Sequence, residues 1–144
     1  MSPMLPLADV VRTRRNDAEA RALADRHYSR QTPGSRDFVG PGRTIILRDL
    51  AGTWLFVWRR TRYRLDGQTG WECALFRNES GRLSSDIILE CEGWVSGRLF
   101  TYVDPLRVRS VNPGYCFLCA GWRRSGRSKV HGLHLLVKEV QPCL

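Results

Sequence analysis

Two runs rich in β-branched and aromatic residues, 43–48 and 53–59, are separated only by the turn Asp49-Leu50-Ala51-Gly52. This spacing predicts a β-hairpin. A strand predicted at residues 99–103 instead follows a helix predicted at residues 85–93. A chain that joins some strands by turns and others through helices is restricted to a mixed α/β sheet. We therefore predict one α/β domain, residues 1–144, with a mixed central sheet flanked by helices.

The other predicted elements follow from capping and turn signals. Asn16 and Glu19 form a capping-box pattern that starts a helix running to about residue 26. A strand is expected at residues 71–76, and Ser84 is the expected cap of the 85–93 helix. Asn112 and Pro113 open a further helix, because each residue is favoured at a helix start. The last strand is expected at residues 133–140, with residues 123–127 as its candidate partner. Residues 1–15 are expected to be flexible.

The chain is strongly basic, with a formal net charge of +9, and only Lys129 and Lys138 among its 23 basic residues are lysines. The planar guanidinium of arginine suits phosphates and base edges better than an ammonium group does. A domain this basic usually binds a polyanion. The alternative is a solvated basic surface without such a partner. The candidate nucleic-acid-binding residues are Arg59, Arg60, Arg62, Tyr63, Arg64, Arg123 and Arg124.

Apolar runs are short throughout the chain. None approaches the roughly 20 residues that span a bilayer, and residues 1–7 are too weakly apolar for a signal peptide. The five cysteines are an odd number, which favours reduced thiols in a core. We therefore expect a cytoplasmic protein with no membrane partner. The sequence leaves a homodimer open.

Asp104 stands directly after the strand predicted at residues 99–103 and before Pro105. A carboxylate at a strand end lies at the rim of the sheet, where open α/β sheets bind ligands. There it can act as a general base. Tyr102 alternates with Asp104, so both side chains are expected at one site. The alternative is that Asp104 simply starts a turn.

A second polar cluster, His27-Tyr28-Ser29, follows the first helix. Histidine can transfer protons near neutral pH or bind a metal. His27, Tyr28 and Asp104 together would form a ligand set suited to iron. The alternative is that His27 and Tyr28 merely end the helix.

The order of elements resembles the Gcn5-related acetyltransferase (GNAT) fold. A closer resemblance is to the phage Mom family of DNA-modification proteins, a divergent branch of that superfamily, and it covers residues 22–136. It is carried by His27-Tyr28-Ser29, Thr101-Tyr102-Val103-Asp104-Pro105 and Asn112-Pro113-Gly114-Tyr115.

The resemblance implies an enzyme that adds a carbamoylmethyl group to the exocyclic amine of adenine in double-stranded DNA. Such a modification protects phage DNA from restriction in the cytoplasm of the host. The resemblance also favours catalytic roles for Asp104, His27, Tyr28, Ser29 and Tyr102.

The usual acetyltransferase loop, whose backbone N–H groups hold the pyrophosphate of coenzyme A, is absent from residues 77–85. Ser84 and Ser85, at the start of the next helix, are the candidate residues for binding an anionic cofactor group, although they also suit an ordinary helix cap. Acetyl-CoA remains a possible donor. The alternatives are an ordinary GNAT acetyltransferase acting on a protein or small amine, and a non-catalytic nucleic-acid-binding protein.

Overall fold

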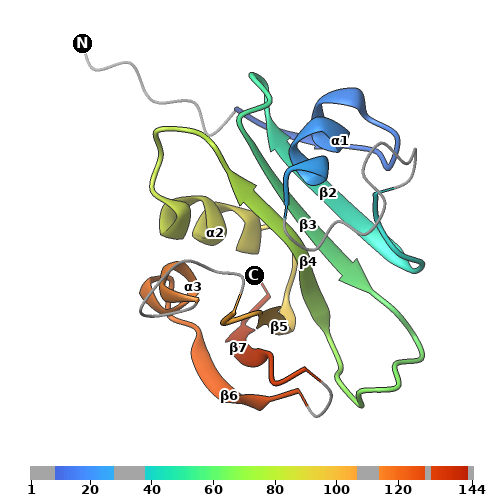
Figure 1. The fold of residues 1–144 in the computed structure, drawn as a ribbon, viewed down its shortest axis with the longest axis vertical. Helices are drawn as coiled ribbons and strands as arrows, with labels where there is room; N and C mark the ends of the chain where they lie inside the picture. Colours follow the sequence, from blue (N-terminus) through green and yellow to red (C-terminus); the bar gives the residue numbers. More distant parts are fainter. Residues whose placement is uncertain (1–8, 28–37, 107–113, 129–130, 143–144) are drawn as a thin grey trace.

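The computed structural model describes residues 9–27, 38–106, 114–128 and 131–142. These residues form one seven-stranded sheet and three helices (Figure 1). The elements are β1 (Val10–Thr13), α1 (Ala18–Asp25), β2 (Arg43–Asp49), β3 (Trp54–Arg60), β4 (Trp71–Asn78), α2 (Ser84–Glu92), β5 (Gly97–Val103), α3 (Tyr115–Cys119), β6 (Arg123–Arg127) and β7 (His134–Val140).

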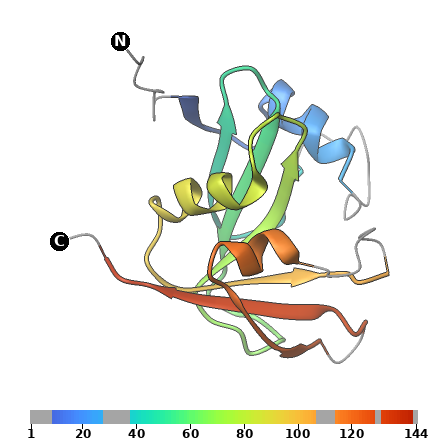
Figure 2. The ribbon, with the colours of Figure 1, turned by 90° about the vertical axis from the view of Figure 1, so that its left-hand side faces the viewer.

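The strand order across the sheet is β1-β2-β3-β4-β5-β7-β6. Strands β4 and β5 pair in parallel and α2 connects them, whereas the other neighbouring strands pair antiparallel. The predicted mixed α/β sheet is therefore confirmed. Figure 2 shows that β2, β3 and β4 run at a wide angle to β5 and β7, so the sheet opens at the β4–β5 junction.

The helices cover both faces of the sheet. Helix α1 packs Ala20, Leu23 and Ala24 onto one face of β2, β3 and β4. Helices α2 and α3 cover the other face, where the large aromatic side chains gather. The indole of Trp58 donates a hydrogen bond to the carbonyl of Cys91 in α2 at 2.9 Å and stacks on Trp122. Apolar burial on both faces holds the helices against the sheet.

The helix caps differ from their predicted positions. Asp17, not Asn16, is the N-cap of α1, and its carboxylate accepts the N–H of Ala20 at 3.0 Å. Arg48 of β2 donates to the same carboxylate at 2.8 Å, so a tertiary partner favours the acidic residue. Leu83 is the N-cap of α2 and makes no side-chain cap bond. The predicted cap of that helix, Ser84, is instead its first residue.

The N-terminal part of the chain also differs from expectation. Residues 10–13 lie in the segment expected to be flexible, yet they form the edge strand β1 against β2. This strand is too short to be recognised from local propensity and is stabilised by the ladder that β2 offers. At the other end of the sheet, β6 pairs with β7, which confirms the predicted partner.

The third helix is short and begins late. It has Gly114 as its N-cap, with φ of 80°, while Asn112 and Pro113 lie outside the described residues. Cys73, Cys91, Cys116 and Cys119 are free thiols. Within the described ranges, no helix has the length and apolar character required to cross a membrane.

Candidate site at the ends of strands β4 and β5

The parallel strands β4 and β5 pair only at their beginnings, through Trp71 with Leu99 and Glu72 with Phe100. One step further along, the hydroxyl of Thr101 donates to the carbonyl of Cys73 at 2.9 Å, so a side chain continues the contact in place of the backbone ladder. The register between β3 and β4 also shifts at this level, and such a bulge bends a strand. The carboxyl ends of β4 and β5 therefore diverge, and this is where α/β sheets commonly bind ligands.

His27 lies just beyond α1 and reaches the carboxyl-terminal half of β4. Its ring is half-buried and hydrogen-bonds to the backbone of Phe76. Burial, followed by the nearby positive charge of Arg77, lowers the pKa of His27 to about 4. The imidazole is therefore neutral at physiological pH, the state in which it can accept a proton or bind a metal.

An ion cluster beside His27 fixes the end of α1 to the end of β4. The carboxylate of Glu79 accepts hydrogen bonds from Arg26 and Arg77, each at 2.7 Å. These bonds, from Arg26 first and Arg77 second, lower the pKa of Glu79 to about 2. Arg77 also donates to the carbonyl of Arg26 at 2.8 Å. The segment that leads into His27 is thus held at a defined position.

Asp104 is the first residue after β5 and is half-buried. Its carboxylate accepts the N–H of Leu106 at 2.9 Å, so it does shape a turn. Because β4 and β5 are parallel, their carboxyl ends lie at the same end of the opening. Asp104 thus follows the carboxyl end of β5, whereas His27 lies beside the carboxyl-terminal half of β4. Tyr28 and Ser29 lie outside the described residues.

Tyr102 makes a different contact from the one expected. Its hydroxyl donates to Asp66 in the loop between β3 and β4 at 3.0 Å. Burial, followed by the hydrogen bond to Asp66 and then by its negative charge, raises the pKa of Tyr102 to about 12. The phenol therefore stays protonated and joins β5 to that loop.

The loop between β4 and α2 uses its own backbone N–H groups internally. Glu79 donates to the carbonyl of Thr53 at 2.7 Å, and Ser80 donates to the side chain of Asn78 at 2.9 Å. Asn78 in turn donates to the hydroxyl of Ser84 at 3.0 Å. These groups are thus not directed at a ligand. The remaining anion-binding capacity is in the first-turn N–H groups of α2, at Ser84 and Ser85.

The described residues do not complete an iron site. His27 has the neutral ring that a metal requires, and Asp104 offers a carboxylate after β5. However, the described ranges hold no group of three or more His, Cys, Asp or Glu side chains able to bind a metal. The third expected ligand, Tyr28, lies outside them. We therefore derive no chemical step that uses iron.

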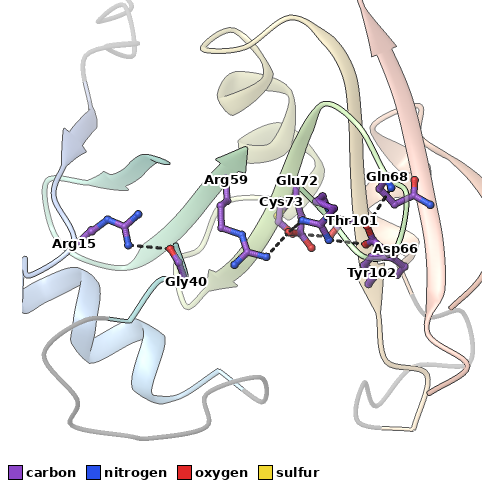
Figure 3. A network of polar contacts seen from close by, with 10 residues as sticks. Arg15, Gly40, Arg59, Asp66, Gln68, Glu72, Cys73, Thr101 and Tyr102 are labelled. Atoms are coloured by element: carbon purple, nitrogen blue, oxygen red, sulfur yellow. Dashed lines mark hydrogen bonds and ion pairs between the residues drawn. The ribbon is translucent and has the colours of Figure 1, made fainter. Parts of the chain in front are cut away.

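The arginines predicted to bind nucleic acid separate into two groups. Arg59 and Arg64 both donate to the same oxygen of Glu72, at 2.9 and 2.8 Å (Figure 3). Arg64 also makes a bidentate contact with Asp66, at 2.7 and 2.9 Å, which raises the pKa of the guanidinium. The charges of these two arginines are therefore neutralised by carboxylates of the protein itself.

The other predicted contact residues are exposed at the surface: Arg60, Arg62, Tyr63, Arg123 and Arg124. Sequence reasoning did not identify the acidic partners of the inner arginines. The sequence around Glu72 could have predicted a basic partner, because a carboxylate between Trp71 and Cys73 in an apolar strand is rarely buried without one. Only 8% of Glu72 is exposed.

No family model, curated protein or solved structure matches this chain. The fold and site therefore define the class of protein: a basic α/β protein with one mixed sheet and a polar rim where two parallel strands separate.

Proposed function

We propose that this protein is a DNA-modifying enzyme that adds a carbamoylmethyl group to the exocyclic amine of adenine, protecting phage DNA from restriction in the host cytoplasm. The observations that support this best are the carboxylate of Asp104 directly after β5, where β4 and β5 separate, and the neutral imidazole of His27 beside β4. An amine that attacks an electrophile must lose a proton, and a neutral imidazole and a carboxylate are both suitable acceptors.

The order of elements also supports the GNAT and Mom resemblance. A central strand, β4, leads through a loop into α2, and β5, α3 and β6 follow with β7 closing the sheet. We therefore propose a GNAT-like fold. The internally bonded loop before α2 favours a divergent member over an ordinary acetyltransferase, because its N–H groups are not available to a pyrophosphate.

In this proposal the adenine amine attacks the methylene carbon of the donor, the donor's leaving group departs with the electron pair of the broken bond, and the carboxylate of Asp104 takes the proton from the amine. His27 assists through its neutral ring, and the first turn of α2 at Ser84 and Ser85 binds an anionic part of the donor. Tyr28 and Ser29 have the supporting roles that the resemblance implies. The adenine must leave the base stack to reach the rim, and the surface arginines hold the DNA backbone.

Nucleoside mass spectrometry of plasmid DNA from cells expressing the protein tests the proposal. The expected result is a fraction of adenine carrying the mass of a carbamoylmethyl group. Asp104→Asn is the informative variant, because the amide oxygen can still accept the N–H of Leu106 but no longer takes up a proton. We expect this variant to bind DNA and to leave adenine unmodified.

Glu139→Gln, at an exposed position of β7, is the control for loss of a carboxylate and should modify adenine as the wild type does. Unmodified adenine from the wild-type protein would contradict the enzymatic proposal. If that protein still bound DNA, it would indicate the non-catalytic alternative. Full modification by Asp104→Asn would exclude Asp104 as the base. Elemental analysis of the purified wild-type protein for iron would decide whether Tyr28 completes a metal site.

A further inference from the structure

The loop between β3 and β4, residues 61–70, exposes two large apolar side chains close together. Tyr63 is 87% exposed and Leu65 is fully exposed. Both stand on the same short segment, separated only by Arg64, whose side chain turns inward to Glu72 and Asp66. Neighbouring exposed apolar groups of this size are typical of a contact surface.

This loop is anchored to β5 by its own side chains and backbone. Asp66 accepts the Tyr102 hydroxyl at 3.0 Å (Figure 3). Arg98 donates to Gln68 and to the carbonyl of Thr69 at 2.7 and 2.8 Å. The guanidinium of Arg64 also lies over the ring of Phe100, 4.9 Å from its centre. A segment held in this way loses little conformational entropy when a partner binds, so its exposed tip is presented ready for contact.

Exposed arginines flank the tip, and the exposed carboxylate beside them, Asp66, is paired with Arg64. Arg60 and Arg62 are exposed, and the guanidinium of Arg60 lies over Trp71. The acidic groups of the region, Glu72 and Asp66, are already paired with arginines beneath the tip. The surface thus combines outward arginines with apolar side chains. That combination is used by proteins that insert a wedge between base steps while basic groups hold the phosphates.

We propose that the β3–β4 loop is a wedge for duplex DNA, with Tyr63 and Leu65 entering between base pairs and Arg60 and Arg62 contacting phosphates. The inference rests on the proposed function, since it supplies the unstacking that exposes an adenine. Duplex DNA is favoured over an acidic protein because the tip adds an aromatic ring, which stacks on bases, to the net charge of +9.

Duplex oligonucleotides carrying 2-aminopurine, whose fluorescence rises when it unstacks, test the wedge directly. Wild-type protein should bind in a salt-dependent manner and raise the fluorescence several-fold at saturation. The double variant Tyr63→Ala with Leu65→Ser should lose this rise even when the DNA is saturated. Arg62→Gln should weaken binding and reduce its salt dependence, yet retain the rise at saturation, because each phosphate contact contributes separately to affinity.

Leu50→Ser is the matched control for the double variant, because Leu50 is 65% exposed in the turn between β2 and β3. Arg14→Gln, at another exposed position, is the control for Arg62→Gln. Circular dichroism melts establish that all variants fold. An equal fluorescence rise in the double variant, or no rise in DNA-bound wild type, would overturn the wedge while leaving the proposed DNA substrate intact. Failure of wild type to bind duplex DNA would overturn both proposals, and binding to polyglutamate through the same residues would assign the loop to an acidic protein.

Discussion

The hydroxyl of Tyr102 donates a hydrogen bond to the carboxylate of Asp66 across 3.0 Å, and this contact joins β5 to the loop between β3 and β4. From the sequence, Tyr102 was predicted to lie at the strand-end site, whereas Asp66 stands in a turn. Their contact places the polar rim and the basic loop in one rigid frame.

Replacing Tyr102 with Phe removes the hydroxyl and keeps the ring. We expect a loss of about 1 kcal/mol in the free energy of unfolding, the usual contribution of one hydrogen bond. Amide hydrogen exchange in residues 61–70 should become faster, because the loop loses one of its anchors. Urea unfolding and exchange mass spectrometry measure the two effects. Tyr115→Phe, at a 60% exposed position on α3, is the control and should leave exchange in the loop unchanged.

Glu72→Gln leaves Arg59 and Arg64 without their shared carboxylate. We expect the free energy of unfolding to fall by about 2 kcal/mol, because removing one member of a buried ion cluster leaves the other charges poorly compensated. Chemical denaturation measures the loss. Glu139→Gln makes the same change at an exposed position of β7, and we expect it to alter stability by less than about 0.5 kcal/mol. Equal effects of the two substitutions would show that the cluster contributes little.

Gly114→Ala should destabilise the junction between α3 and the sheet. Gly114 has φ of 80°, and a Cβ atom there would lie 2.5 Å from the Leu136 side chain. Gly67 has a similar φ of 74° but open space around the same atom. Both alanine variants carry the backbone penalty of about 1–2 kcal/mol, and Gly114→Ala should add about 1–3 kcal/mol from overpacking. Thermal unfolding of the two variants isolates the steric difference, and identical melting temperatures would contradict it.

The free energy of unfolding should decrease as the pH is lowered through a range set by the pKa of His27. Its pKa is about 4 in the folded state against 6.5 as the ordinary value, so the unfolded chain takes up the proton first. The free energy of unfolding should therefore decline as the pH falls from about 6.5 to 4, by about 1.4 kcal/mol for each unit of difference between the two pKa values. Above that range it should not depend on His27. Urea titrations at several pH values measure the slope, which His27→Gln should flatten.

The control for this slope is His131→Gln, which changes the same residue type at an exposed position. Glu79 contributes in a separate and lower range. Its pKa is lowered from 4.5 to about 2, so its stabilising contribution is present above pH 4.5 and is lost as the pH falls toward 2. An unchanged slope between pH 6.5 and 4 in His27→Gln would show that the ring is not buried in its neutral form.

Features that depend on neighbouring residues could be predicted from the sequence, whereas features that depend on residues distant in the chain could not. The hairpin of β2 and β3 was predictable, because a short turn between two apolar runs is a local signal. The N-cap of α1 was misplaced by one residue, since Arg48, distant in sequence, pairs with Asp17 and not with Asn16. Strand β1 was not predicted because its pairing depends on the edge of β2.

The candidate site shows the same division. That Asp104 follows a strand and that the chain is rich in exposed arginine could be read from the sequence alone. The sequence could not show that Arg59 and Arg64 face Glu72, because this depends on the register that places Arg59 opposite Glu72 across two strands. It also assigned Tyr102 to the strand-end site, whereas the structure gives its hydroxyl to Asp66.

The sequence by itself determined the mixed α/β class, the basic character and the carboxylate at the end of β5, because turn chemistry, periodicity and composition act over a few neighbouring residues. Only the tertiary structure decided which arginines are neutralised, where β4 and β5 separate and how burial near Arg77 keeps His27 neutral. Those properties arise from charges and backbone groups that are far apart along the chain. Their energies depend on distance and burial, which only the folded chain defines.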